Sequence, residues 1–525
     1  MPVHLKSLVV IMVLALPMLW LLRRVACEQA IDPLDYKRRA AMWVALTLLI
    51  FVTHNYWIYA LISVLLLFVA GGRDSNRFCF YLFLLLAIPP FHAQVPGLGV
   101  FERLMYVDHV RWMALAVLLP AYWSLRTKPE VVPFGRTAVD KFVLAYMLLW
   151  FVLQMQTTTL TNVLRISVYL FTDTFLPYYV ASRALRNLRD YRDALMSFVV
   201  AVVVMSPAAV FELARYWLLY NGLSDAMGLG YWGMGNYLPR GAGGMLRASV
   251  TTGHPIALGF MMAVAMGLAA YLRPSISSKR SWWLLMFGLA VGLVAALSRG
   301  PWVGAAAMVL VLLVTGPKVA SKLMQAFLWS LVAIPVLLST EQGQKILDYL
   351  PYIGTVDARN VDFRERLVEV SLGVLAHFPF FGALDFMSHP EMEQMRGSDG
   401  IIDIVNTYLG VTMSSGLVGL TLFLFPFLLV VLGILRVLHR EHDKEGEIHL
   451  LGRSLLATLI GIMVSIATVS AIVAIPAVYL SVIGMGAGYL RLLAERSSAP
   501  APVPAEPPAR WAAAGRREGQ PRAQH

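Results

Sequence analysis

Apolar runs long enough to cross a bilayer recur along the whole chain, and short polar segments separate them. A helix needs about 20 apolar residues to cross roughly 30 Å of hydrocarbon. We expect such helices near residues 5–22, 41–54, 56–70, 77–95, 109–125, 142–157, 165–181, 194–212, 254–272, 282–297, 301–315, 323–339, 415–435, 453–470 and 472–490. Polar residues interrupt the stretch 41–70 at positions 53–55. This stretch could therefore form a hairpin, a re-entrant pair or one long helix. The pattern predicts an all-α polytopic membrane protein with roughly 12–15 transmembrane helices.

Composition strengthens this prediction. The 525 residues are 58% hydrophobic and only 14% charged, whereas soluble proteins carry about 25% charged residues. Such a chain has too little polar surface to coat a water-soluble fold, so soluble, disordered and fibrous classes are excluded for the chain as a whole. The two cysteines, Cys27 and Cys79, lack the spacing of a metal site or a disulfide framework.

The chain is basic, with 43 Lys and Arg against 31 Asp and Glu and a net charge of +12. In a soluble protein this excess would suggest nucleic acid, but in a membrane protein basic residues collect in cytoplasmic loops. The expected helices place the basic loops around residues 23–39, 126–136, 183–192, 273–280, 318–322 and 436–444 on one side. We therefore assign that side to the cytoplasm and expect no nucleic-acid partner.

Loop lengths divide the chain into six regions. We expect an N-terminal transmembrane bundle over residues 1–212, a periplasmic loop over 213–253, transmembrane helices over 254–339, a large periplasmic loop over 340–405, C-terminal transmembrane helices over 406–496 and a cytoplasmic tail over 497–525. The tail is basic and rich in Ala and Pro, a composition typical of disorder. Long outward loops usually carry function, so the chemistry is expected there. The second loop begins with the spacing of an amphipathic helix, which its charged residues Asp362, Arg364, Glu365, Arg366 and Glu369 follow.

Several arginines on the outward side depart from the charge rule. They are Arg240, Arg247, Arg299, Arg359, Arg364 and Arg366. The arginine side chain offers a fixed fork of donors that matches phosphate oxygens, so this group is suited to a lipid-linked pyrophosphate. Pairing with local carboxylates such as Glu212, Asp362 or Glu369 remains the alternative for each arginine. The sequence has no nucleotide-binding or metalloprotease motif, and we expect neither a metal nor a cofactor.

Five short segments follow one another in the second half of the chain. They read Arg247-Ala-Ser-Val-Thr-Thr-Gly-His254-Pro255-Ile-Ala-Leu-Gly259, Leu297-Ser-Arg299-Gly-Pro-Trp-Val-Gly304, His377-Phe-Pro-Phe-Phe-Gly382, Asp403-Ile-Val-Asn406-Thr-Tyr408-Leu and Ser415-Gly-Leu-Val-Gly-Leu420. This ordered set, over roughly residues 240–435, resembles the signatures of the O-antigen ligase/polymerase superfamily.

The resemblance implies a bacterial inner-membrane glycosyltransferase with a periplasm-facing site, which takes a glycan from an undecaprenyl-pyrophosphate carrier in an inverting, metal-independent reaction. Ligases of the family carry a His-Asn pair where this chain has Val405 before Asn406. The local sequence is more similar to polymerases that extend a carrier-linked repeat, and a ligase acting on lipid A core or protein is the alternative. The implied partners are the undecaprenyl-pyrophosphate-linked oligosaccharide, membrane lipid and a polysaccharide export complex.

The resemblance also implies roles for individual residues. Arg247 and Arg299 would hold the pyrophosphate. A base is then needed for the acceptor hydroxyl, and Asp403 can serve if partial burial raises its pKa. Further candidates for the substrate site are Arg240, His254, Arg364, Arg366, His389, Asn406 and Tyr408. The two histidines are alternative bases, and Asn406 and Tyr408 would orient the acceptor.

A transporter or flippase for a lipid-linked glycan is the candidate from another functional class. Such a transporter would consist of two halves with similar sequence patterns. The two long loops differ in length and composition, which argues against this candidate.

Overall fold

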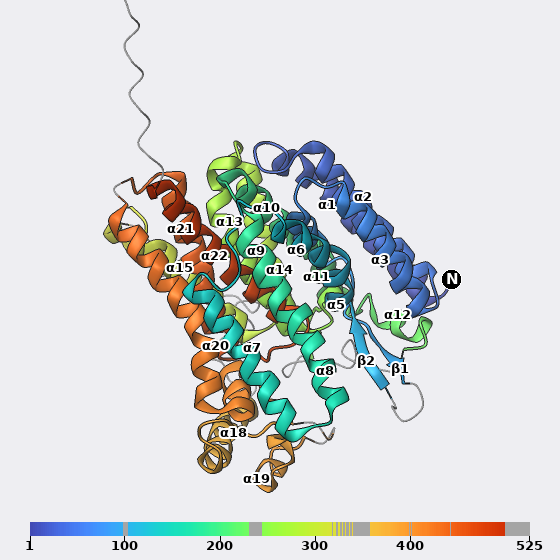
Figure 1. Ribbon diagram of the computed structural model, residues 1–525. Coiled ribbons are helices and arrows are strands. Elements are labelled where there is room, and N and C mark those ends of the chain that lie inside the picture. The colour runs from blue at the N-terminus through green and yellow to red at the C-terminus, as the bar shows by residue number, and fades with distance from the viewer. Residues whose placement is uncertain are drawn as a thin grey trace, which may run out of the picture.

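The computed structural model describes residues 1–97, 103–229, 244–317, 358–397, 402–441 and 443–498, together with Gly400 and scattered positions between 319 and 339. Helices make up nearly all of this part of the chain and run side by side as a bundle (Figure 1). The predicted all-α polytopic architecture is confirmed. By length and composition, seven described helices can cross a membrane, and two shorter apolar helices accompany them. The total of 12–15 crossings stays a prediction.

The first three helices settle the ambiguity at residues 41–70. Helix α1 spans Val3–Ala26, α2 spans Pro33–Val52 and α3 spans Tyr56–Gly72. Helix α2 ends at Thr53, and the side chain of Asn55 caps α3 by accepting hydrogen bonds from the backbone N–H groups of Trp57 and Ile58. A residue that caps the next helix stops the first one, so this stretch forms two separate helices.

The predicted span over residues 77–95 is wrong. Helix α4 covers only Arg77–Leu84, and a two-stranded antiparallel hairpin follows, formed by β1 (His92–Pro96) and β2 (Arg103–Asp108). Every residue from Phe78 to Leu86 is at most 3% exposed. The apolar run therefore reflects burial inside the bundle, and the prolines at positions 89 and 90 prevent further helix.

The helices of the middle region follow the predicted order. They are α5 (His109–Met113), η1 (Ala114–Leu118), α6 (Leu119–Arg126), α7 (Ala138–Thr157), α8 (Leu160–Tyr169), η2 (Leu170–Phe175), α9 (Leu176–Ala184), α10 (Leu188–Val203), α11 (Ser206–Arg215) and α12 (Asn221–Ala226). Both η1 and η2 are π-helical turns, and each is followed at its second residue by a proline, Pro120 or Pro177. Because proline lacks a backbone donor, it disturbs the α-helical ladder at these two points.

The remaining elements form the second half of the bundle and its outer cap. They are η3 (Val250–Thr252), α13 (Pro255–Leu272), η4 (Arg273–Ser275), α14 (Lys279–Ala295), α15 (Arg299–Val314), α18 (Ala358–His377), η5 (Phe386–Ser388), α19 (Pro390–Glu393), α20 (Thr407–Arg440), α21 (Glu447–Ile466) and α22 (Ile475–Ser498). Helix α13 is the central one: it contacts α10, α14, α15 and α21. The predicted helix near 323–339 falls largely outside the described residues.

Small residues let α15 approach its neighbours closely. A Cβ atom at Gly304 would collide with the side chain of Ser465 and lie 2.8 Å from the carbonyl oxygen of Gly461, both on α21. A Cβ atom at Gly259 on α13 would lie 3.1 Å from Pro301 Cβ. Small residues at such crossings favour close helix packing in membranes. The start of α15 is thereby fixed against α13 and α21.

Candidate functional site

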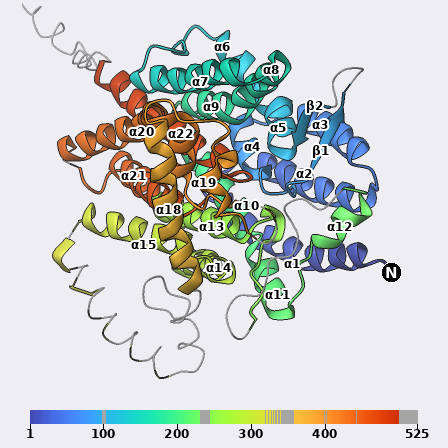
Figure 2. The ribbon, with the colours of Figure 1, turned by 90° about the horizontal axis from the view of Figure 1, so that it is seen from below.

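A cavity of about 1090 Å³ lies between α15, α18 and α21. Its charged lining residues are Arg299, Arg364, Glu365 and Glu369. The rest of the wall is mainly apolar and includes Val303, Val368, Leu372, Ile460, Met463 and Val464. Helices α18 and α19 lie at the end of the bundle opposite the loop between α1 and α2 (Figures 1 and 2). The cavity thus joins two predicted site arginines to an apolar surface.

Arg299 is the first residue of α15 and enters the cavity from the turn after α14. This turn is tightly held: the indole N–H of Trp302 donates to the carbonyl of Leu293 at 2.9 Å, and Gly300 lies against the side chain of Thr468. A Cβ atom at Gly300 would collide with Thr468. The glycine beside Arg299 is therefore required for close packing against the turn that follows α21.

Arg364 comes from α18, whose two faces differ. One face carries Leu367, Val370 and Val374 into a second apolar core, apart from the main bundle core, and the other lines the cavity. The helical spacing of charges in the large loop predicted this helix correctly. Arg366 points elsewhere, because its Nη2 donates to Gln394 Oε1 at 3.1 Å. Of these two predicted arginines, Arg364 lines the cavity and Arg366 does not.

The loop that carries Arg247 is held by Glu212, a residue that we had considered only as a counter-ion. The Glu212 side chain on α11 is fully buried, and its carboxylate accepts hydrogen bonds from the backbone N–H groups of Leu219, Ser249 and Val250 at 2.9–3.0 Å. The N–H of Ala248 donates to the carbonyl of Ala295 at the end of α14. Glu212 thereby fixes the Arg247 loop against α11, and the Ala248 hydrogen bond joins the same loop to the region that leads into Arg299.

His254 caps the N-terminus of α13 and lies just before the candidate span Pro255–Ser275. Its Nδ1 accepts a hydrogen bond from the backbone N–H of Ile256 at 3.1 Å, so the neutral ring carries its proton on Nε2. Burial, together with the nearby charge of Arg247, lowers the pKa of His254 to about 3. A neutral imidazole of this kind is suited to donating a hydrogen bond and is a poor general base.

The Asp403–Tyr408 segment meets the turn after α21. The hydroxyl of Ser470 donates to the carbonyl of Ile404 at 2.8 Å and lies 3.5 Å from Asp403 Oδ1. Thr468, two residues earlier in this turn, lines the cavity and contacts Gly300. Asp403 and Arg299 are therefore attached to the same turn. The partial burial expected for Asp403 is not seen, because its side chain is exposed.

The other two candidate residues of this segment, Asn406 and Tyr408, have structural contacts. Asn406 caps α20, since its side-chain oxygen accepts a hydrogen bond from the backbone N–H of Leu409. The Tyr408 hydroxyl donates to the carbonyl of Met463, which itself lines the cavity. Tyr408 therefore supports the cavity wall from behind, a position that differs from the predicted contact with an acceptor.

His389 lies beside α19 in a separate cluster. Its ring centroid is 5.5 Å from that of His377, and His377 Nε2 lies 3.4 Å from Glu391 Oε1. Arg240 lies outside the described residues, as does the side chain of Arg359. Within the described part of the chain, no group of three or more His, Cys, Asp or Glu side chains is arranged to hold a metal ion.

A comparison with known protein families tests the resemblance that the sequence motifs suggested. Residues 284–424 match the family model described as O-antigen ligase. The resemblance to the O-antigen ligase/polymerase superfamily is confirmed. The matched O-antigen ligase segment contains Arg299, Arg364 and Asp403, and begins after the Arg247 loop. No curated protein matches the chain. The chain is thus a multi-pass membrane protein in which residues 284–424 are similar to O-antigen ligases, a likeness that points to a glycosyltransferase-like enzyme.

Proposed function

We propose that this protein is a polysaccharide polymerase of the bacterial inner membrane. It transfers a glycan from an undecaprenyl-pyrophosphate carrier onto a carrier-linked repeat unit at the periplasmic face. The observation that carries this proposal is the cavity of about 1090 Å³, in which Arg299 and Arg364 share one space with an apolar wall. A polyprenyl pyrophosphate has the matching character, because a polyanionic head is joined to a hydrocarbon tail.

The lining residues divide naturally between these two parts of the donor. Arg299 and Arg364 provide fixed donors for the phosphate oxygens. Val303, Ile460 and Val464 provide an apolar surface for the first isoprene units. Glu365 and Glu369 on the same helix as Arg364 accept hydrogen bonds from sugar hydroxyls.

The reaction needs little chemical assistance from the protein. The acceptor hydroxyl oxygen attacks the anomeric carbon, the bond from that carbon to the pyrophosphate oxygen breaks, and the configuration inverts. The electron pair leaves with the pyrophosphate, where the arginines stabilise the developing charge. The hydroxyl proton passes to the Asp403 carboxylate. This carboxylate is exposed, so it serves as the base without the burial expected from the sequence. Its support is the contact with Ser470, in the turn that also carries Thr468 of the cavity wall. No metal is required for this balance.

The second candidate is a ligase that transfers the glycan to lipid A core or to protein. The family description itself favours it. The presence of Val405 in place of a histidine before Asn406 supports the polymerase.

Acceptor identity separates these functions. The full-length protein is placed in liposomes with lipid-linked repeat extracted from cells that lack the protein, with or without lipid A core. A polymerase yields a ladder of longer carrier-linked chains and releases undecaprenyl pyrophosphate. Product found only when lipid A core is supplied would overturn the polymerase in favour of the ligase. Movement of labelled lipid across the membrane without a new glycosidic bond would overturn both.

A further inference from the structure

A second polar region lies at the other end of the bundle from the Arg299 cavity. Two cavities, of about 360 and 280 Å³, adjoin each other there and share Ser75, Asn76 and Asp190 as lining residues. We call the larger of the two the Asn76 cleft; the smaller one is acidic, with Asp32, Asp35, Asp190 and Asp193 beside Arg189. The Asn76 cleft lies where the loops after α3, α6 and α9 meet, which is the side that the basic-residue rule assigns to the cytoplasm.

The Asn76 cleft carries three basic residues. Arg77 at the start of α4, Lys128 in the loop after α6 and Arg186 in the loop after α9 line it. Two carboxylates also line it, and each is already engaged. Asp74 is ion-paired with the buried Arg39 at 2.7 Å, and Asp190 accepts a hydrogen bond from the backbone N–H of Arg186 at 2.9 Å.

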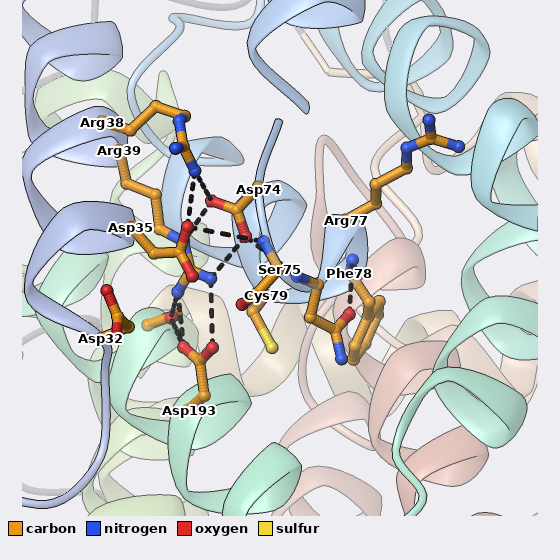
Figure 3. A network of polar contacts seen from close by, with 12 residues as sticks. Asp32, Asp35, Arg38, Arg39, Asp74, Ser75, Arg77, Phe78, Cys79 and Asp193 are labelled. Carbon is orange, nitrogen blue, oxygen red and sulfur yellow. Dashed lines mark hydrogen bonds and ion pairs between the residues drawn. The ribbon is translucent and has the colours of Figure 1, made fainter. Parts of the chain in front are cut away.

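The two arginines of this cleft, Arg77 and Arg186, use only some of their guanidinium N–H groups in the hydrogen bonds described below. Arg77 Nη1 donates to the carbonyl of Pro120, and its guanidinium points away from the Arg39 network (Figure 3). Arg186 Nη1 pairs with Glu130 at 2.9 Å, whereas its Nη2 is buried and has no hydrogen-bond partner among the described residues. Buried donors are nearly always satisfied in proteins, so a missing acceptor is expected beside Arg186, which lines the Asn76 cleft and also a smaller neighbouring cavity that contains Glu130.

The start of α4 adds to this positive character. Helix α4 begins at Arg77 in the wall of the cleft and is buried along its length. The N-terminus of a helix carries a partial positive charge. Nearby, the exposed Trp123 lies under Arg126, with 5.8 Å between the guanidinium carbon and the ring centroid. Trp and Arg in this arrangement are typical of the membrane–water interface.

We propose that the Asn76 cleft binds the phosphate of an anionic lipid headgroup from the cytoplasmic leaflet. Arg186 and Lys128 contact the phosphate oxygens, and the acyl chains lie against the outside of α6. Basic pockets between transmembrane helices on the cytoplasmic side recognise headgroups in this way. The site is separate from glycan transfer, so its test and that of the polymerase are independent.

The experiment measures lipid retention by the delipidated full-length protein in detergent, using native mass spectrometry. Phosphatidylglycerol is titrated against the parent protein and the double variant Lys128→Gln/Arg186→Gln. Both residues are accessible at the surface, so the variant is expected to fold. We expect retention to weaken about tenfold, or ~1.4 kcal/mol. The double variant Arg136→Gln/Lys141→Gln removes the same charge from exposed residues outside the cleft, and should change retention less than twofold.

Three outcomes would overturn the proposal. Equal weakening in both double variants would show a general charge effect with no defined site. Equal retention of diacylglycerol, which has no phosphate, would remove phosphate recognition. If glycerol 3-phosphate or inorganic phosphate bound as tightly as phosphatidylglycerol, the lipid assignment would fail and the ligand would be a soluble phosphate.

Discussion

Arg39 and Arg299 both lie within the helical bundle, and their surroundings are opposite. The Arg39 side chain is completely buried and contacts two carboxylates, those of Asp74 and Asp193 (Figure 3). Arg299 opens onto a cavity of about 1090 Å³ that it shares with Arg364. The same side chain therefore has two uses in this fold. Enclosed by carboxylates it joins helices, and facing a cavity it is placed to meet an anion.

The Arg39 network joins segments that are far apart in sequence. Arg39 belongs to α2, Asp74 to the loop after α3, and Asp193 to α10. Ser197 accepts a further hydrogen bond from Arg39. Each charge in the network depends on the others, because an isolated charge in such a site is very costly. Removing one residue of the Arg39 network should therefore lower the free energy of unfolding more than any substitution at the Arg299 cavity does.

The largest effect is expected from Arg39→Ala. It leaves two carboxylates buried without their cation, which costs about 3–5 kcal/mol in the free energy of unfolding. Denaturant unfolding of the detergent-solubilised protein measures this loss. The control is Arg396→Ala, because Arg396 pairs with Glu393 at 2.7 Å and both side chains are exposed; the free energy of unfolding should change far less in this variant. Equal losses in the two variants would remove the distinction between the network and a surface pair.

The second effect concerns rate. Arg299→Ala should lower the rate of chain extension about 100-fold, because a fixed donor for the leaving group is lost, while thermal stability changes little. Arg364→Ala should act in the same direction. Arg366→Ala is the matched control, since Arg366 lies on the same helix and contacts Gln394. A rate loss in Arg366→Ala as large as in Arg364→Ala would contradict the assignment of the cavity.

The third prediction concerns Glu212, which acts on the rate through the position of the Arg247 loop. Glu212→Gln keeps the shape of the side chain but places an NH₂ group against backbone donors, so the Arg247 loop loses its position. We expect about a tenfold fall in kcat with little change in KM, in line with the loss of one or two buried hydrogen bonds. Glu212→Asp, which keeps the carboxyl group, should recover part of the rate. An equal loss of folded protein in both variants would make Glu212 purely structural.

The sequence predicted the parts of this comparison that depend on local patterns. The helical spacing of Arg364, Glu365 and Glu369 predicted α18, and the Ser298–Gly304 segment predicted the turn that presents Arg299. Apolar content alone could not separate a membrane span from a buried helix, so residues 77–95 were assigned wrongly. For Glu212 there was one signal, a lone acidic residue in an apolar helix, which is a feature of functional or buried polar sites in membrane proteins.

Contacts between distant segments were beyond the sequence. Tyr408 follows a motif residue and was expected at the acceptor, yet its hydroxyl reaches the carbonyl of Met463 on another helix. Periodicity within one helix could not have shown that contact, because it depends on how α20 packs against α21. Likewise, Arg364 and Arg366 are two residues apart on one helix, and only the packing of α18 shows which of them lines the cavity.

The smallest effect on activity is expected at His254, and it distinguishes a hydrogen-bond donor from a base. With a pKa of about 3 in the folded protein, His254 stays neutral between pH 5 and 8, so the pH dependence of the rate should be the same in His254→Asn as in the parent. Asparagine can still cap α13. Stability should differ in a defined direction. The unfolded histidine has a pKa near ~6.5, so the unfolded state binds more protons and the parent loses stability as the pH falls below ~6.5. His254→Asn should lack this loss in denaturant unfolding, and a shift of the rate profile in that variant would make His254 the base after all.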